Sequence, residues 1–183
     1  MLSNTDTTVT AAGARLWAQP DWATRPAILA ADDVLTYGEL HRRVGVAAAA
    51  LHAAGVQPGD YVAVAMERSP AQLVAILCVM AAGACPCPLE PRLAHAETAR
   101  RVAAVGLAWM LFDDDHAATA QGCGLAPARC LPAQELARGD SAWPRLPRGA
   151  RDPGLLLFTS GSTGHPKGCL LYTSPSPRDV EES

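Results

Sequence analysis

Two spacings of apolar residues recur along this chain, one typical of helices and one of short buried strands. Apolar residues at helical spacing cover residues 37–54, 70–82 and 94–105. Short apolar runs typical of strands cover residues 26–30, 34–36, 61–66, 85–89, 108–112 and 155–158. Strands and helices that alternate in this way predict parallel βαβ units and an α/β fold.

Local signals place several of these boundaries. Thr36 and Glu39 have the spacing of a capping box at the start of the first helix, and Gly55 is typical of its end. The Ser69-Pro70 pair predicts the start of the second helix, because proline is favoured at the first helical position. That helix carries Leu73, Ile76, Leu77 and Met80 on one face, which we expect to lie in the core. Asp32-Asp33 predicts the turn of a hairpin between the first two strands.

The remaining segments are less regular. Residues 1–10 form a polar leader, and a short helix is predicted over residues 11–19, before Pro20. Residues 122–152 are rich in Pro, Gly, Arg and Ala and predict a long connection. Within it we expect a short strand near residues 129–131 and a helical turn over residues 133–137.

A loop rich in glycine and hydroxyl residues follows the last predicted strand, and it carries the chemistry of the chain. It reads Thr159-Ser160-Gly161-Ser162-Thr163-Gly164-His165-Pro166-Lys167-Gly168. Glycines let backbone N–H groups approach a ligand closely, and consecutive N–H groups form an anion-binding nest. The hydroxyls add donors and Lys167 adds a compact positive charge. This combination predicts a polyphosphate site; the alternative is a flexible Gly/Ser surface loop.

Two common motifs do not fit this loop. The P-loop pattern needs a second glycine where Pro166 stands, and a hydroxyl residue after Lys167, where Gly168 stands. The nucleophile elbow needs glycine two residues before its serine, but Phe158 and Ser160 occupy those places. Lys167 is also the only lysine in the chain, all other basic side chains being arginine. Chance could explain this, but a lone lysine also suggests a position where a wide guanidinium does not serve.

The segment F-T-S-G-S-T-G-H-P-K-G resembles the phosphate-loop signature of the adenylate-forming enzymes, with His165 at the variable position. These enzymes are the acyl-CoA and aryl-CoA synthetases, the adenylation domains of nonribosomal peptide synthetases, and the luciferases. Two earlier segments resemble family elements in the same order. They are Leu35-Thr36-Tyr37-Gly38-Glu39-Leu40 and M-A-A-G-A-C-P-C-P-L-E-P, residues 80–91. The resemblance covers nearly the whole chain up to Gly168 and implies the partial N-terminal AMP-binding domain over residues 11–168.

The resemblance implies a reaction in two steps. A carboxylic or amino acid attacks the α-phosphate of Mg-ATP, and the acyl group then passes to the thiol of CoA or of a phosphopantetheine carrier protein. It further implies that Thr159, Ser160, Gly161, Ser162, Thr163 and Gly164 bind the β- and γ-phosphates. Lys167 would be both a binding and a catalytic residue, because it neutralises charge on the leaving pyrophosphate.

Much of the family's machinery has no counterpart before Gly168, including the adenine and ribose segments, the magnesium ligand and the C-terminal lysine. We therefore expect the 183 residues alone to be inactive and to bind ATP weakly. One alternative is a small non-catalytic nucleotide-binding or regulatory module. An unrelated phosphotransferase is disfavoured by the failed P-loop count. The acyl substrate and the thiol acceptor cannot be read from these residues.

Composition excludes other classes of function. A net charge of −3 gives no basic patch for nucleic acid. No apolar run approaches a membrane span and no signal peptide is visible, so we expect a cytoplasmic protein. The six cysteines lack metal-ligand spacing, and we expect Cys85 and Cys87 to be buried on one side of a strand. The run from Asp113 to His116 could suggest a metal, but its position at a strand end favours a solvated turn. No metal ligand is predicted.

The last residues differ from the family pattern. After P-K-G the family continues into an apolar residue and then a helix, whereas residues 169–179 resemble a translated sequencing-library adaptor. Residues 180–183 would then be barcode and flanking sequence. The alternative is a native proline-rich tail. We expect native sequence to end at Gly168, with residues 169–183 excluded from the fold.

Overall fold

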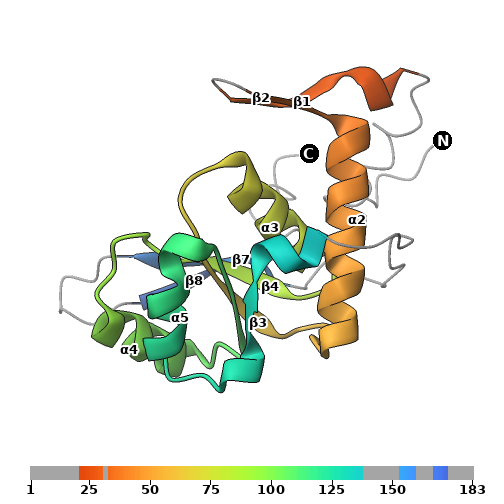
Figure 1. The fold of residues 1–183 in the computed structure, drawn as a ribbon. Helices are drawn as coiled ribbons and strands as arrows, with labels where there is room; N and C mark the ends of the chain where they lie inside the picture. Colours follow the sequence, from red (N-terminus) through yellow and green to blue (C-terminus); the bar gives the residue numbers. More distant parts are fainter. Residues whose placement is uncertain (1–20, 31–32, 138–152, 160–166, 173–183) are drawn as a thin grey trace, which may run out of the picture.

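The computed structural model describes residues 21–30, 33–137, 153–159 and 167–172, drawn in colour in Figure 1. The predicted leader and the helix over residues 11–19 lie outside the described residues, as do residues 138–152 of the long connection. The elements up to β4 are η1 (Trp22–Thr24), β1 (Pro26–Ala30), β2 (Asp33–Thr36), α2 (Tyr37–Ala54), β3 (Tyr61–Ala65), α3 (Pro70–Ala81) and β4 (Cys85–Pro88). The later elements are α4 (His95–Val105), β5 (Trp109–Phe112), η2 (Asp114–His116), α5 (Ala117–Gly122), η3 (Pro127–Arg129), β6 (Cys130–Pro132), η4 (Ala133–Ala137), β7 (Pro153–Thr159) and β8 (Lys167–Tyr172).

The N-terminal hairpin and α2 match the predicted boundaries. β1 and β2 pair antiparallel, with Leu29 opposite Val34. The capping box is present, because the Glu39 N–H donates to the Thr36 hydroxyl at 3.3 Å and the Thr36 N–H donates to the Glu39 carboxylate at 3.0 Å. α2 ends at Gly55, whose φ of 102° lies in the left-handed region that glycine adopts without strain. None of the described helices has the length and apolar character needed to cross a lipid bilayer.

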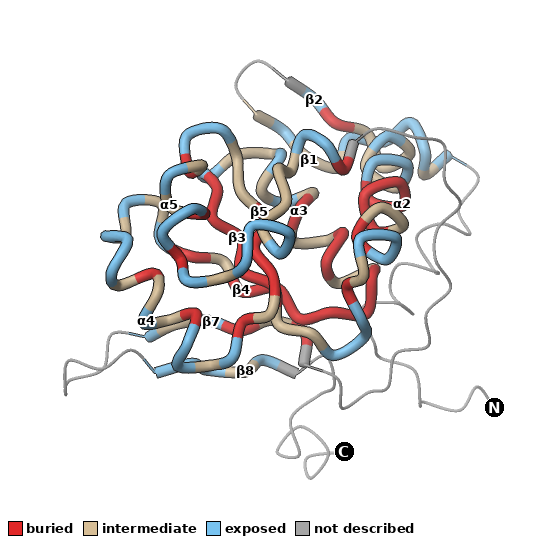
Figure 2. Tube along the Cα trace, turned by 60° about the horizontal axis from the view of Figure 1, so that its bottom comes forward, coloured by how far each residue is buried: buried red, intermediate tan, exposed pale blue. Residues whose placement is uncertain are grey.

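A parallel sheet with the strand order β4-β3-β5-β6 forms the centre of the molecule and confirms the predicted α/β class. The chain moves from β3 to β4 in one direction across the sheet and from β4 to β5 in the other. Because such crossovers are right-handed, α3 and α4 must cover opposite faces. Side chains on alternate positions of β3 show this: Val62 and Val64 pack with α2 and α3, whereas Ala63 and Ala65 pack with α4 and α5. The buried strands run between these two groups of helices in Figure 2.

The buried face of α3 differs from the prediction. The structure buries Ala75, Cys78 and Val79, whereas Leu73 is 45% exposed and Met80 is only partly buried. The small side chains of Ala75 and Cys78 let α3 lie close to the sheet and to α2, which larger residues on that face would prevent. The predicted stripe of larger residues therefore lies at the edge of the interface.

Strand β7 also differs from the prediction of a buried strand. It does not join the parallel sheet but pairs with β8 in a separate antiparallel hairpin. One face of β7 is covered and the other is not, so Leu156 is buried while Leu157 is exposed. The predicted short strand and helical turn of the long connection are confirmed as β6 and η4. α5 was not predicted.

Candidate phosphate-binding site

The loop predicted to bind phosphate is the connection of the β7–β8 hairpin. The two strands pair antiparallel from Leu155 opposite Leu171 to Thr159 opposite Lys167. The hairpin therefore closes at the two residues that flank the loop, which spans residues 160–166. The predicted ligand residues Ser160, Gly161, Ser162, Thr163 and Gly164 lie outside the described residues.

Thr159 and Lys167 are brought together although eight positions separate them in the sequence. Residues directly opposite in an antiparallel pair point to the same face of the hairpin. The Thr159 hydroxyl also donates to the Lys167 carbonyl oxygen at 3.4 Å. Both residues are exposed, and within the described residues the Lys167 ammonium has no ion-pair partner. One hydroxyl and one positive charge therefore stand together at the base of the loop.

The inner face of the hairpin packs on the core beside α4. Leu156 is 3% exposed, and Phe158 and Leu170 lie against the same cluster of buried side chains. Gly168 completes this face because a Cβ atom there would lie 3.0 Å from Val105 Cγ1 and 3.1 Å from Leu156 Cδ1. Distances this short are not tolerated without movement of the neighbours. Glycine after the lysine therefore avoids a close contact with α4, because a larger residue there would push the Val105 and Leu156 side chains aside.

Arg101 of α4 contacts the other strand of the hairpin. Its guanidinium carbon lies 5.0 Å from the centroid of the Phe158 ring, within the range of a cation–π contact. Glu97 accepts a hydrogen bond from Arg101 Nε at 3.1 Å, which orients the guanidinium. One helix thus supports both ends of the loop, through Phe158 before it and Gly168 after it.

The segment from Asp113 to His116 at the end of β5 is less solvated than the predicted turn, because Asp113 is hydrogen-bonded and His116 is buried. Asp114 and Asp115 are exposed as expected, but His116 is only 5% exposed. Asp113 caps η2 and also accepts a hydrogen bond from the Glu67 N–H at 2.8 Å. It therefore joins the carboxyl ends of β3 and β5. Over the described ranges, no group of three or more His, Cys, Asp or Glu side chains is placed to hold a metal.

Both ring nitrogens of His116 face acceptors. Nδ1 contacts the Asp113 carboxylate, and Nε2 lies 2.9 Å from the Pro91 carbonyl oxygen. A carbonyl and an ionised carboxylate can only accept, so the geometry favours an imidazolium with a proton on each nitrogen. Burial opposes that charge, but Asp113, the Pro91 carbonyl and Glu67 outweigh it and raise the pKa of His116. Burial also opposes ionisation of Asp113, yet hydrogen bonds from His116 and the Glu67 N–H lower the pKa of its carboxyl group.

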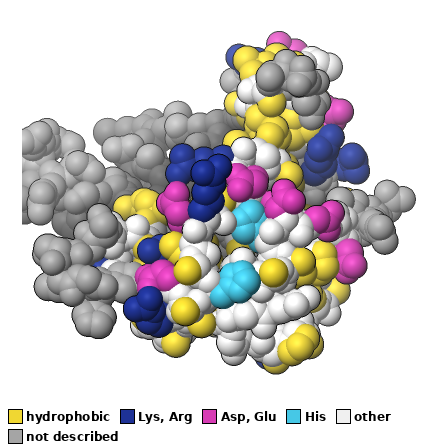
Figure 3. Space-filling view, turned by 60° about the vertical axis from the view of Figure 1, so that its left-hand side comes forward, with side chains coloured by type: hydrophobic (Ala, Val, Ile, Leu, Met, Phe, Trp, Pro, Cys, Tyr) yellow, Lys and Arg dark blue, Asp and Glu magenta, His cyan; other side chains and the backbone are white. Residues whose placement is uncertain are grey.

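The surface beside α4 and α5 carries mixed charges. Basic, acidic and histidine side chains are interspersed over this face in Figure 3, and no broad field of one sign covers the residues drawn in colour. On this face, any attraction of a polyphosphate must therefore come from individual cationic groups, not from a general positive potential.

Comparison with known proteins gives one family. The family model described as AMP-binding enzyme matches residues 17–175. A feruloyl-CoA synthase from Amycolatopsis is 42% identical over 137 residues, which cover 75% of this chain and 28% of the relative. The pyochelin synthetase PchE from Pseudomonas aeruginosa is 36% identical over 142 residues, which cover 78% of this chain and 9% of the relative. The chain thus spans only 28% of the feruloyl-CoA synthase and 9% of the pyochelin synthetase.

Solved structures agree with this result. The N-terminal subdomain of NpsA from Klebsiella oxytoca, in complex with 3-hydroxybenzoyl-AMSN, superimposes with a TM-score of 0.76 at 26% identity. The match covers 91% of this chain and 41% of that one. MatB from Rhodopseudomonas palustris, without ligand, has a TM-score of 0.74 at 32% identity and covers 87% of this chain and 34% of its own. The chain therefore belongs to the family of AMP-binding enzymes, and its fold is that of the N-terminal subdomain of the adenylate-forming members.

Proposed function

We propose that this chain supplies the nucleotide-phosphate loop of an ATP-dependent ligase that activates carboxylic acids. In the proposed reaction a carboxylate oxygen attacks the α-phosphorus of ATP. An acyl-adenylate forms and pyrophosphate leaves. A thiol then attacks the acyl carbonyl, and AMP leaves. Membership of the AMP-binding family supports this class of reaction.

The closure of the hairpin at Thr159 and Lys167 is the observation that carries the proposal. Thr159 and Lys167, the residues that flank this loop, are strand partners, so the two ends of the loop lie side by side. That closure suits a loop whose backbone N–H groups are proposed to surround an anion. We assign the β- and γ-phosphates to Thr159–Gly164 and charge neutralisation on the leaving pyrophosphate to Lys167. Preorganised donors of this kind stabilise charge that develops in the transition state.

The exposed Lys167 ammonium fits a polyphosphate ligand, since it makes no ion pair within the described residues. The Thr159 hydroxyl donates to the Lys167 carbonyl oxygen in this structure and would have to turn from it to donate to a phosphate. Magnesium would enter with the nucleotide and offset charge on the phosphate oxygens. Its protein ligand is expected outside this sequence.

The substrate and the acceptor are proposed only as classes. A feruloyl-CoA synthase among the relatives supports CoA as the acceptor, whereas the pyochelin synthetase supports a carrier-protein phosphopantetheine. The substrate would be a carboxylic or amino acid. We propose the cytoplasm as the compartment, where ATP and both thiols are present.

Whether the 183 residues are active by themselves is also a matter of proposal. Because it spans 28% of the feruloyl-CoA synthase, we propose that the 183 residues alone do not catalyse adenylate formation. Incubation of the chain with ATP, labelled pyrophosphate and a panel of carboxylic acids should give no labelled ATP. Exchange above the level of a chain-free control would contradict this.

The origin of residues 169–183 stays a prediction. Cys169–Tyr172 pair with β7 in the structure, and the family match extends to residue 175. A long sequencing read of the source DNA across the Gly168 codon tests the prediction. We expect the frame to continue into the nucleoside-binding segments of the family. A genome that encodes residues 169–183 followed by a stop codon would favour the nucleotide-binding module instead.

A further inference from the structure

Two cysteines that the proposed function does not use lie side by side. Cys123 follows the last residue of α5, and Cys130 is the first residue of β6. Their sulfur atoms are 3.8 Å apart. Both thiols turn toward the same acceptor, the Ala120 carbonyl oxygen, at 3.0 Å from Cys123 Sγ and 3.6 Å from Cys130 Sγ. This shared partner holds the two thiols in one small volume.

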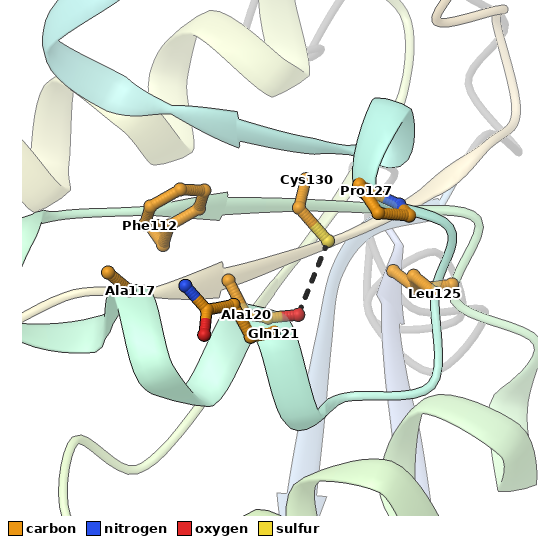
Figure 4. A pocket seen from close by; sticks show the side chains of 7 residues that line it. All are labelled: Phe112, Ala117, Ala120, Gln121, Leu125, Pro127 and Cys130. Carbon is orange, nitrogen blue, oxygen red and sulfur yellow. Dashed lines mark hydrogen bonds between the residues drawn. The ribbon is translucent and has the colours of Figure 1, made fainter.

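A cavity opens onto one of these thiols. Its volume is about 180 Å³, and its walls come from β5, α5 and the segment before β6, including Phe112, Gln121 and Leu125. Cys130 lines the cavity and is partly exposed, whereas Cys123 is fully buried behind it. Figure 4 shows the Cys130 sulfur directed toward the Ala120 carbonyl at the edge of this space. A small reagent therefore reaches Cys130 first.

We propose that Cys123 and Cys130 form a pair of neighbouring thiols that closes to a disulfide when a small oxidant of the hydroperoxide class enters this cavity. The Cys130 sulfur attacks one oxygen of hydrogen peroxide, the O–O bond breaks, and a sulfenic acid and one water form. The Cys123 sulfur then attacks the Cys130 sulfur, which forms the S–S bond and releases a second water. Both sulfurs are oxidised and the peroxide is reduced, with the two thiol protons leaving in water.

The surroundings make this a slow site. Burial, together with the neighbouring Cys123 thiol, raises the pKa of Cys130 to about 12. The thiolate is the nucleophile in such reactions, so little of the reactive form is present near neutral pH. The pair should therefore stay reduced under mild conditions and close only under sustained oxidation.

The sequence allows a direct readout. Trypsin cleaves after Arg129, between the two cysteines, so the disulfide would join peptides 102–129 and 130–138. The full chain carrying Cys169→Ser is the background, because Cys169 is exposed and would form links between molecules. After treatment of the folded chain with hydrogen peroxide, we expect an intact mass lower by two hydrogens than that of the untreated chain. Alkylation of the remaining thiols should then add two groups fewer than it adds to the fully reduced chain. The two-peptide species should appear and should separate on reduction.

Matched variants assign the pair. Cys130→Ser and Cys123→Ser should each lose the linked species completely. Cys78→Ser should retain it, since Cys78 is buried against the opposite face of the sheet. If a variant fails to fold, the Cys169→Ser chain can be oxidised in urea as an independent comparison. In the unfolded chain we expect a mixture of disulfides, without preference for the link between Cys123 and Cys130. Absence of the linked species from the folded chain would overturn the proposal, as would the same mixture of pairs with and without urea.

Discussion

The Cα atoms of Thr159 and Lys167 are partners across the β7–β8 hairpin, and the Thr159 hydroxyl donates to the Lys167 carbonyl oxygen at 3.4 Å. This pair fixes the two ends of the loop that is predicted to bind phosphate. A glycine-rich loop with free ends would lose much conformational entropy on surrounding a ligand. Strand pairing at both ends removes part of that cost before the ligand arrives.

Gly168 should be sensitive to the smallest substitution. We expect Gly168→Ala to lower the free energy of unfolding by about 1–3 kcal/mol, because the new methyl group meets Val105 and Leu156 at 3.0 and 3.1 Å. Urea titration followed by circular dichroism measures this change. Gly122→Ala is the matched control, since a Cβ there lies at an ordinary 3.4 Å from the His95 Cβ. Val105→Ala should restore part of the loss, and equal effects of the two glycine substitutions would contradict the account.

The contact between Arg101 and Phe158 should be measurable as a coupling between α4 and the hairpin. A double-mutant cycle with Arg101→Ala and Phe158→Ala should give an interaction free energy of about 0.5–1 kcal/mol. Arg100→Ala provides the control, because Arg100 also pairs with Glu97 but makes no contact with the ring. Coupling of Arg100 to Phe158 that is as strong as that of Arg101 would show that the effect is not a cation–π contact.

His116 should make stability depend on pH. Its pKa is raised in the folded chain, so its stabilising contribution is complete below the unfolded value of about 6.5 and is lost as pH rises through the folded value. The lowered pKa of Asp113 acts in the other direction, and its contribution is lost only as pH falls through the folded value, below the ordinary range of a carboxyl group. Glu67, which also faces His116, favours the charged ring. The pair should therefore stabilise the fold most in mildly acidic solution.

His116→Gln tests this pH dependence. Urea midpoints of the parent chain should fall as pH rises above the ordinary histidine range, and His116→Gln should lose that part of the decrease. His52→Gln is the comparison, because His52 is exposed near the end of α2. The account would be contradicted if the pH dependence of the urea midpoint were unchanged in His116→Gln but reduced in His52→Gln, because the titrating group would then be His52.

Local signals in the sequence predicted the helix boundaries well. The capping box at Thr36 and Glu39, the Ser69-Pro70 start and the Gly55 end each depend on atoms within one helical turn. The predicted face of α3 is only partly right: Ile76 and Leu77 pack against the core, but two overlapping stripes have the same helical spacing and the buried one contains Ala75, Cys78 and Val79. Only the distance to the neighbouring layer decides that the small residues Ala75 and Cys78 lie inward.

Contacts between residues far apart in the sequence were not predicted, because they depend on tertiary structure and leave no local signal. β8 forms only by pairing with β7, and no strand is predicted there because residues 169–179 by themselves resemble a translated adaptor. The burial of His116 depends on Pro91, which lies 25 positions earlier, and Asp113 depends on Glu67, which lies 46 positions earlier. The phosphate chemistry of the loop stays a prediction, because it rests on the residue types of glycines, hydroxyls and a lysine, and of the predicted ligands only Thr159 and Lys167 lie within the described residues.

Pyrophosphate exchange by the protein expressed from the native reading frame tests the central claim most directly. We expect labelled pyrophosphate to enter ATP only when a suitable carboxylic acid is present, and Lys167→Ala to slow this exchange by a factor of about a hundred to a thousand. Lys167→Arg should recover little of the loss, since a planar guanidinium replaces a compact ammonium. Arg100→Ala, which removes an exposed cation on α4, should leave exchange unchanged. Exchange that is equally fast in Lys167→Ala and the parent protein would contradict the assignment of this loop to phosphate chemistry.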